Sequence, residues 1–307
     1  MQGLVQKSRG SWYTVLLSNG VKEECKIRGK FRIKGLKLTN PVAVGDVVEV
    51  ELKENETSVI TEIQERRNYI IRKSVNLSKQ YHILASNVDQ AILLVTIDSP
   101  VTTFEFIDRF LISAEAYGIP VSIVVNKMDL YGQEQKERLA ELLTIYEDLD
   151  YPVKMISVAN GKNIEQVIDL LSGKTSVIVG HSGVGKSSLL NELSLDYELK
   201  TSEISEVHQQ GTHTTTFAEM LSLPGGGYII DTPGIKGLGV VDIEKEELGN
   251  YFRELMRLKA SCHFHNCVHI NEPKCAVKQA VELGEVSEWR YRSYLSIYEG
   301  DQESMHR

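Results

Sequence analysis

The spacing of apolar and polar residues predicts short β-strands over the first part of the chain. Apolar residues alternate with polar ones in runs of strand length, and turn residues such as Ser18-Asn-Gly20 separate these runs. The predicted strands cover residues 12–17, 21–27, 31–35, 43–52 and 58–63. Five short strands with regular turns and no helical period predict a small closed β-barrel.

The pattern changes at residue 88, where runs typical of buried strands begin to alternate with amphipathic helices. Strands are predicted at residues 88–97, 120–125, 153–157 and 175–179, and helices at 104–116, 133–149 and 164–171. Strands separated by helices of this length predict a parallel sheet with helices on both faces. Residues 64–87 show no clear period and are predicted to form a linker.

The last part of the chain is predicted to be helical. The helices cover residues 244–258, a segment from Cys275 to near Gly284, and residues 288–298. The last of these is rich in basic and aromatic residues, so it either contacts RNA or packs against the rest of the protein. We therefore expect three domains, at residues 1–72, 73–240 and 241–307.

Composition and hydropathy are those of a globular protein. The chain has 307 residues, of which 42% are hydrophobic, which suits two or three domains. Residues 1–10 contain no apolar signal region, and apolar runs such as 91–95 are too short to span a bilayer. We therefore expect a cytoplasmic protein with no membrane association.

Charge is distributed unevenly. Residues 1–80 hold 15 Lys and Arg against 9 Asp and Glu, whereas residues 81–307 hold 19 against 33. Basic residues cluster around Phe31, namely Lys26, Arg28, Lys30, Arg32, Lys34 and Lys37. The cluster favours an anionic partner for the barrel, most simply RNA, over the alternative of an ordinary solvated strand face.

The segment Gly180-His-Ser-Gly-Val-Gly-Lys-Ser187 matches G-x-x-x-x-G-K-[ST] between a predicted strand and a helical pattern. Its glycines let backbone N–H groups turn toward a phosphate, and the following helix points its positive end at the same place. Lys186 is expected to bind the β- and γ-phosphates, and Ser187 to bind Mg²⁺. The predicted nucleotide contacts here are Gly180, His181, Ser182, Gly183, Val184, Gly185, Lys186, Ser187 and Ser188.

The tetrapeptide Asn126-Lys-Met-Asp129 follows a predicted strand directly and matches the N-K-x-D element with which GTPases read guanine. Guanine presents two N–H donors that the Asp129 carboxylate can accept together, and adenine lacks this pair. Asn126 is expected to contact the base edge and brace the loop, and the stem of Lys127 to lie along the base. Backbone N–H groups of Ser157-Val-Ala-Asn160 are a weaker candidate for guanine O6. GTP is therefore predicted over ATP.

Two motifs after the phosphate loop are predicted to sense the γ-phosphate. Gly211-Thr-His-Thr-Thr-Thr216 offers Thr215, or alternatively Thr214, to Mg²⁺, although such a segment is also typical of a surface loop. Asp231-Thr-Pro-Gly234 matches D-x-x-G, with Asp231 near Mg²⁺ and the Gly234 N–H toward the γ-phosphate. The base-reading motif precedes the phosphate loop, the reverse of the order in Ras-like proteins. A circularly permuted GTPase domain is therefore predicted.

Three of the four cysteines lie between residues 262 and 275. In a cytosolic protein this spacing favours a tetrahedral zinc site over disulfides or unliganded buried thiols. The fourth ligand is open among three histidines, of which His263 is badly placed because it adjoins Cys262. Cys275 is expected in the first turn of a helix, where the helix dipole favours the thiolate. The candidate ligands are Cys262, Cys267, Cys275, His263, His265 and His269.

Together these motifs resemble, over nearly the whole chain, the RsgA (YjeQ) family of ribosome small-subunit-dependent GTPases. The resemblance implies an N-terminal OB-fold, a circularly permuted P-loop GTPase domain and a C-terminal helical zinc-binding module. It also implies that the partner is the small ribosomal subunit with its rRNA, in late maturation. Matching the family motif C-x₄-C-x-H-x₅-C assigns zinc to Cys262, Cys267, His269 and Cys275. Thr212 is a departure, because the family usually has a basic residue there.

The predicted reaction is Mg²⁺-assisted attack of water on the γ-phosphate of GTP, with Lys186 and the loop N–H groups stabilising the developing charge. Ile235 follows D-x-x-G where a water-positioning glutamine is usual, so intrinsic hydrolysis is expected to be slow. His213 is the candidate for that role, the alternative being an exposed loop histidine. The competing hypothesis is an RNA-binding assembly protein that uses GTP as a structural ligand. We expect the protein to be a monomer.

Overall fold

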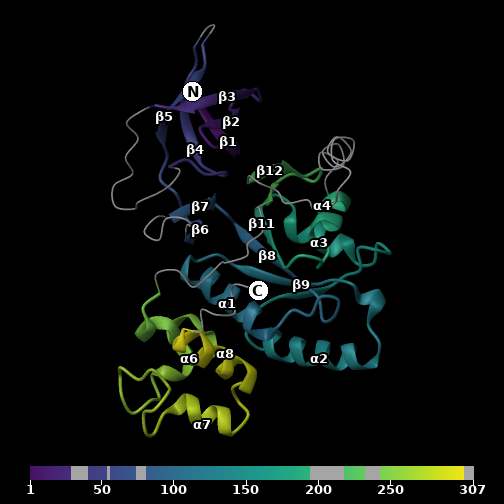
Figure 1. Ribbon diagram of the computed structural model, residues 1–307, viewed down its shortest axis with the longest axis vertical. Helices are drawn as coiled ribbons and strands as arrows, with labels where there is room; N and C mark the ends of the chain where they lie inside the picture. Colours follow the sequence, from purple (N-terminus) through teal and green to yellow (C-terminus); the bar gives the residue numbers. More distant parts are fainter. Residues whose placement is uncertain (29–40, 54–55, 74–80, 194–217, 232–242, 301–307) are drawn as a thin grey trace.

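Three parts lie along the longest axis of the molecule in the computed structural model, with an α/β sheet in the middle (Figure 1). The N-terminal strands lie at one end and the C-terminal helices at the other. The structure describes residues 1–28, 41–53, 56–73, 81–193, 218–231 and 243–300. No helix in these ranges combines the length and the apolar character that crossing a bilayer requires.

The N-terminal part is a closed five-stranded barrel, as predicted. Its strands are β1 (Gln2–Arg9), β2 (Trp12–Leu17), β3 (Lys22–Ile27), β4 (Val47–Glu51) and β5 (Ser58–Ile63). They pair in the order β1-β2-β3-β5-β4, and β4 pairs back onto β1. The sequence pattern missed β1, because a bulge between Val5 and Lys7 interrupts its alternation. The predicted strand 31–35 lies outside the described residues.

The predicted linker at residues 64–87 is wrong at residues 69–73 and 81–86, which form strands. Strands β6 (Tyr69–Lys73) and β7 (Tyr81–Ser86) form an antiparallel ribbon between the barrel and the central sheet. Ile70 and Leu84 pack into the core of the central part, while Ile71 and Ile83 pack with Ala43 on the other face. Because both faces are buried, the ribbon lacks the alternation that would have identified it.

The central sheet has helices on both faces, as predicted. Its parallel strands are β8 (Gln90–Val95), β9 (Val121–Val125), β10 (Val153–Met155), β11 (Thr175–Val179) and β13 (Tyr228–Asp231). One face is covered by α1 (Phe104–Ala116) and α2 (Gln133–Glu147), the other by α3 (Ile164–Leu171) and α4 (Lys186–Leu193). The strand order is β10-β9-β8-β11-β13-β12, so β11 lies between the first and last parallel strands of the chain.

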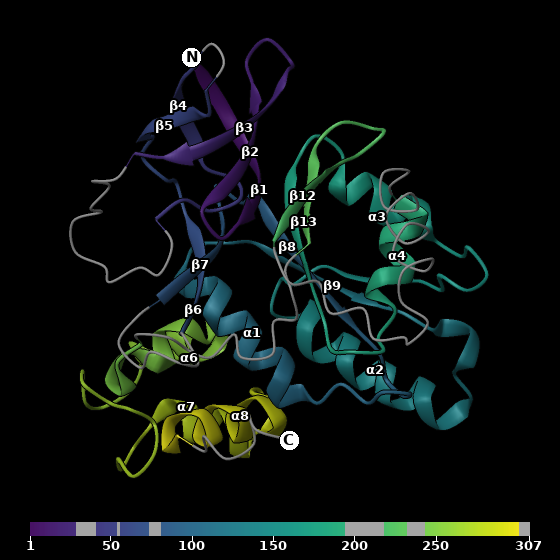
Figure 2. The ribbon, with the colours of Figure 1, turned by 45° about the horizontal axis from the view of Figure 1, so that its top comes forward.

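The edge strand β12 (Glu219–Ser222), which the pattern did not predict, joins this sheet to the barrel. It runs antiparallel to β13, and its Glu219 pairs with Lys7 of β1. Figure 2 shows β12 and β1 side by side. The barrel and the central sheet thus form one continuous eleven-stranded sheet.

The C-terminal part is helical, but its first helix differs from the prediction. A 3₁₀ helix η2 (Lys245–Tyr251) precedes α6 (Arg253–Lys259), and α7 (Ala276–Glu282) and α8 (Glu288–Glu299) follow. Phe252 interrupts the predicted helix 244–258 with extended dihedrals and a fully buried ring. Helix α8 is a packing helix, since Arg290 and Tyr294 are each 1% exposed.

Candidate nucleotide-binding and metal sites

The phosphate loop connects β11 to α4, and its glycines are required by its backbone. Gly183 and Gly185 have φ of +86° and +97°, in the left-handed region. A Cβ at Gly180 would lie 2.5 Å from the Leu94 carbonyl oxygen, and one at Gly185 would collide with the Asn126 amide. Val184 is buried, whereas Ser182 in the loop and Ser187 and Ser188 at the start of α4 are exposed. The loop can therefore present N–H groups and hydroxyls to a phosphate chain.

Lys186 lies beside the aspartate of D-x-x-G. Its Nζ is 2.7 Å from the Asp231 Oδ1, and Asp231 is 3% exposed at the end of β13. The pairing of β11 with β13 brings these motifs together, because Ile178 and Asp231 are neighbours in register. The two strands thus place an ammonium and a carboxylate at one edge of the sheet, where phosphate and Mg²⁺ chemistry needs them.

The Asn126–Asp129 turn is braced against the phosphate loop. Asn126 is 2% exposed, donates from Nδ2 to the Val184 carbonyl at 2.9 Å and accepts from the Val158 N–H at 3.1 Å. Asp129 is exposed, and its carboxylate accepts a hydrogen bond from the Ser157 hydroxyl. The predicted bracing by Asn126 is thus present in the structure, and the loop after β10 contributes to it through Val158.

Two contacts in this region had no signal in the sequence. The rings of His181 and Phe106 have centroids 3.5 Å apart, which ties the phosphate loop to the first turn of α1, and burial lowers the pKa of His181. The Lys127 ammonium donates to the carbonyl of Ser99, in the loop between β8 and α1. Because the partners are far apart in sequence and have ordinary residue types, no local pattern indicated them.

Four residues of the predicted nucleotide site lie outside the part of the chain that the structure describes. They are His213, Thr214, Thr215 and Gly234. Their roles in binding Mg²⁺, the γ-phosphate and the attacking water stay predictions.

Four side chains of the C-terminal part converge as a metal site would require. One donor atom from each of Cys262, Cys267, His269 and Cys275 lies within 4.8 Å of the others. The His269 Nδ1 is 3.6 Å from the Cys262 Sγ and 3.4 Å from the Cys275 Sγ, and those two sulfurs are 3.9 Å apart. A tetrahedral zinc ion sets S···N and S···S distances of about 3.5 and 3.8 Å. The donors therefore fit zinc.

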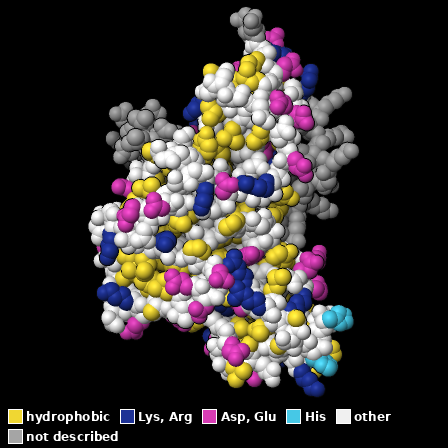
Figure 3. Space-filling view, turned by 180° about the vertical axis from the view of Figure 1, so that it is seen from behind, with side chains coloured by type: hydrophobic (Ala, Val, Ile, Leu, Met, Phe, Trp, Pro, Cys, Tyr) yellow, Lys and Arg dark blue, Asp and Glu magenta, His cyan; other side chains and the backbone are white. Residues whose placement is uncertain are grey.

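The structure selects among the candidate histidines. His269 is 1% exposed and has φ of 61°, which turns it into the cluster, whereas His263 and His265 are exposed. Figure 3 shows exposed histidine side chains at the outer end of the C-terminal part. The Glu272 carboxylate supports the turn by accepting from the N–H groups of Val268 and Ile270 at 2.7 and 2.9 Å.

Cys275 differs from its prediction. It is the N-cap residue of α7 and not part of the first turn, and burial raises its pKa instead of favouring the thiolate. Burial likewise raises the pKa of Cys267 to about 12. Desolvation is the largest cause for both thiols, while the Lys278 N–H in the first turn of α7 acts to lower the pKa of Cys275. A bound cation would stabilise both thiolates.

The barrel presents one aromatic and cationic pair on its outer surface. Trp12 is 41% exposed, and the Lys26 Nζ lies 4.2 Å from the centroid of its ring. Arg28 is also exposed, with Glu51 at 3.8 Å. The rest of the predicted basic cluster, from Lys30 to Lys37, lies outside the described residues. On the face shown in Figure 3, basic and acidic side chains are interspersed.

Comparison with known proteins gives a consistent result over the full length. The RsgA GTPase family model matches residues 63–241, and the RsgA N-terminal domain model matches residues 2–60. Proteins named small ribosomal subunit biogenesis GTPase RsgA are similar to this chain: that of Christiangramia forsetii is 54% identical over 99% of this chain and 98% of its own. The protein of that name from Bacteroides fragilis is 52% identical over 100% of this chain and 99% of its own.

Two solved structures share the architecture. The crystal structure of YjeQ from Thermotoga maritima has a TM-score of 0.77 and 37% identity, covering 100% of this chain and 99% of that one. YloQ, described as a circularly permuted GTPase, has a TM-score of 0.74 and 31% identity, covering 100% and 96%. The permuted fold predicted from the order of the motifs is thereby confirmed.

Proposed function

Because the chain belongs to the RsgA GTPase family, and is therefore an enzyme that hydrolyses GTP, we propose that it acts in late maturation of the small ribosomal subunit. In this proposal the subunit stimulates GTP hydrolysis. Full-length similarity to proteins named for biogenesis of that subunit carries the proposal. Such a partner also implies a cytoplasmic location, and the chain is proposed to act as a monomer.

We propose that the chain has three domains with different roles, at residues 1–72, 73–240 and 241–307. The first boundary falls within β6, so the ribbon β6–β7 would belong to both neighbours. The barrel is proposed to contact rRNA through Trp12, Lys26 and the basic residues that follow. Stacking of a base on an exposed ring beside a cation is a common mode of single-strand binding.

In the proposed nucleotide site, GTP or GDP lies across the edge formed by the loops after β9, β11 and β13. Asp129 accepts the two guanine N–H donors, with Asn126 and Lys127 holding the turn. Backbone groups from Gly180 to Ser188 bind the phosphates together with Lys186. Mg²⁺ would be held by Ser187 and Thr215, near Asp231, and would neutralise charge on the phosphates.

In the proposed reaction a water oxygen attacks the γ-phosphorus, the bond to the β–γ bridging oxygen breaks, and GDP and phosphate leave. Lys186 and the loop N–H groups, with that of Gly234, would stabilise the charge that develops on the phosphoryl oxygens. His213 is proposed to orient the water. Ile235 has no polar side chain for that role, which is consistent with a dependence on the subunit.

One zinc ion per chain is proposed on Cys262, Cys267, His269 and Cys275. Because the protein would fill all four positions, the ion would be structural and not catalytic. Metal analysis of the purified protein should give one zinc per chain, and Cys267→Ser should lose it.

The decisive experiment is GTP turnover titrated with small subunits, large subunits and free RNA at two salt concentrations. Stimulation by small subunits alone supports the proposal, and a steep loss with salt supports phosphate contacts by the barrel. Lys186→Ala should abolish binding or turnover, whereas Lys162→Ala, an exposed lysine of the same domain, should not. Single-turnover hydrolysis that small subunits leave unchanged would favour the structural-ligand alternative.

A further inference from the structure

Tyr131 lies just after the base-reading turn, at a position that the N-K-x-D motif does not include. It follows the 3₁₀ helix η1 (Met128–Leu130), and its side chain is 6% exposed in the core of the central part. Burial raises the pKa of Tyr131 to about 12. The hydroxyl is therefore protonated at neutral pH and can donate a hydrogen bond.

The Tyr131 hydroxyl joins the end of β8 to the start of the turn. The Ile97 N–H donates to it at 2.8 Å, and it donates to the Asn126 carbonyl oxygen at 2.5 Å. The Asn126 N–H donates to the Val95 carbonyl at 2.9 Å. Both backbone groups of Asn126 are thus tied to β8 and the residues after it, one directly and one through Tyr131.

The peptide that Tyr131 holds is the one where the turn changes direction. Lys127 has φ of 65°, in the left-handed region, and its ammonium donates to the Ser99 carbonyl. The bend places Asp129 against Ser157, whose hydroxyl donates to the carboxylate. A shift of the Asn126 carbonyl would therefore move Lys127 and Asp129 together.

We propose that the Tyr131 hydroxyl is a positioning group that holds the Asn126–Asp129 turn in the geometry needed to discriminate guanine from related bases. This inference rests on the guanine site proposed above. The ring of Tyr131 fills the core whether or not it carries a hydroxyl, so Tyr131→Phe separates positioning from packing.

The test is equilibrium binding of GDP and IDP to full-length Tyr131→Phe, with GTP turnover measured in parallel. IDP lacks the 2-amino group, so it offers Asp129 one N–H donor where GDP offers two. The matched control is Tyr151→Phe, because Tyr151 is 1% exposed and its hydroxyl donates to Glu115 at 2.9 Å. Tyr151 precedes β10, at the opposite end of that strand from Ser157.

In Tyr131→Phe, affinity for GDP should fall about three- to tenfold, the equilibrium effect of one buried hydrogen bond. IDP affinity should fall less, so the GDP-to-IDP ratio narrows, while kcat at saturating GTP is unchanged. Tyr151→Phe should keep the wild-type ratio. An unchanged ratio in Tyr131→Phe would overturn the inference, whether the affinities stay as in wild type or fall in parallel. Failure of the wild type to prefer GDP over ADP would instead overturn the guanine site itself.

Discussion

The barrel and the C-terminal module are attached to the GTPase domain by junctions of different kinds. The barrel is held by a hydrogen-bonded hub between residues close in sequence and by the pairing of two edge strands. The C-terminal module is held by an ion cluster inside an apolar interface, between residues far apart in sequence. The two junctions lie on opposite sides of the central sheet (Figure 1).

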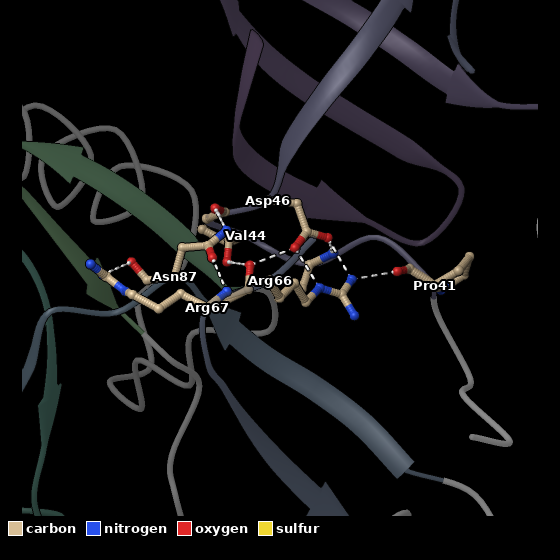
Figure 4. Close-up of polar contacts among 9 residues, drawn as sticks. Pro41, Val44, Asp46, Arg66, Arg67 and Asn87 are labelled. Atoms are coloured by element: carbon tan, nitrogen blue, oxygen red, sulfur yellow. Dashed lines mark hydrogen bonds and ion pairs between the residues drawn. The ribbon is translucent and has the colours of Figure 1, made fainter. Parts of the chain in front are cut away.

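The hub of the barrel junction is Asp46, which is fully buried just before β4. Its carboxylate accepts from Arg66 Nε and Nη2, both at 2.6 Å (Figure 4). It also accepts from the Ser86 hydroxyl at 2.6 Å and from the Ala43 N–H at 2.8 Å. Arg66 and Ser86 lie 20 and 40 residues from Asp46 in the sequence. The hub can therefore form as soon as the barrel meets the ribbon that follows it.

The C-terminal junction centres on Arg290 of α8, which is 1% exposed. Its guanidinium is 2.5 Å from Asp108 of α1 and 2.6 Å from Glu254 of α6, and the Tyr146 hydroxyl donates to Asp108 at 2.8 Å. Ile112, on the same helix as Asp108, belongs to the apolar cluster of the C-terminal module. Because Asp108 and Arg290 are 182 residues apart, this junction needs both domains to be folded.

Helix α1 contacts both the nucleotide site and the C-terminal module, whereas the barrel is attached through the Asp46 hub and an edge strand. Its first turn touches the phosphate loop through Phe106, and its outer face carries the module. The barrel reaches the sheet at β12, the neighbour of the strand that carries Asp231. We therefore expect loss of the C-terminal junction to cost more stability than loss of the barrel junction, since buried unpaired charge is the larger penalty.

The largest expected effect comes from removing the zinc ion proposed for the C-terminal part. Structural zinc contributes on the order of 10 kcal/mol to the folding of small domains, and Cys267 and Cys275 lie in the core of the module. In Cys275→Ser, hydrogen exchange should become fast in α7 and α8 and stay slow in β6 and β7. His263→Ala is the control, because this exposed histidine lies outside the cluster. Slow hydrogen exchange in α8 of Cys275→Ser would show that the C-terminal module stays folded without the ion.

Next in size is Arg290→Met, which leaves the Asp108 and Glu254 carboxylates buried without their cation. A loss of about 3–5 kcal/mol is expected for breaking a buried ion pair on one side. Local stability of α8 from native-state hydrogen exchange measures it. Arg292→Met on the same helix removes an exposed pair with Glu288 and should cost about 0–1 kcal/mol. Equal effects of the two variants would contradict the buried cluster.

A smaller effect is expected from Asp46→Asn, which keeps the size of the side chain and removes its charge. Hydrogen bonds to a charged group contribute about 1.5–3 kcal/mol, so the ribbon β6–β7 should lose stability of that order. Faster hydrogen exchange in β6 and β7, with no change in α8, is the expected result. Glu62→Gln, an exposed carboxylate on β5, should change neither. If α8 lost as much stability as the ribbon, the two junctions would unfold as one cooperative unit, which would contradict their independence.

The smallest effect is expected from Lys7→Met at the bridge between β1 and β12. The Lys7 Nζ lies 3.1 Å from Glu219, and their side chains are 19% and 23% exposed. A partly solvated pair of this kind contributes about 0.2–1 kcal/mol, because water and salt screen it. Urea unfolding at low and high salt should show a small difference that shrinks as salt rises. A loss larger than that of Asp46→Asn would make the strand bridge the main attachment of the barrel.

Much of the fold and of the candidate nucleotide site was predictable because the signals are local. The phosphate loop and the run Asn126–Asp129 were recognised because the residue types that each motif requires are neighbours in the sequence. The bounds of α1, α3 and β11 were predicted to the residue from the pattern of apolar positions. The cysteine spacing likewise indicated a metal site but left the fourth ligand open among three histidines. The family resemblance assigned His269, and the structure buries this residue among the thiols.

Only the tertiary structure decided the features whose partners come from distant segments. Arg290 belongs to a helix that resembles a basic, RNA-facing one, yet its guanidinium is buried because Asp108 and Glu254 meet it there. The ribbon β6–β7 and the Tyr131 bridge likewise depend on neighbours that no window of sequence contains. Local sequence determined which residues are candidates for binding a nucleotide and a metal ion. Contacts between distant segments determined which polar residues are buried, because a polar side chain is buried only where the fold supplies its partner.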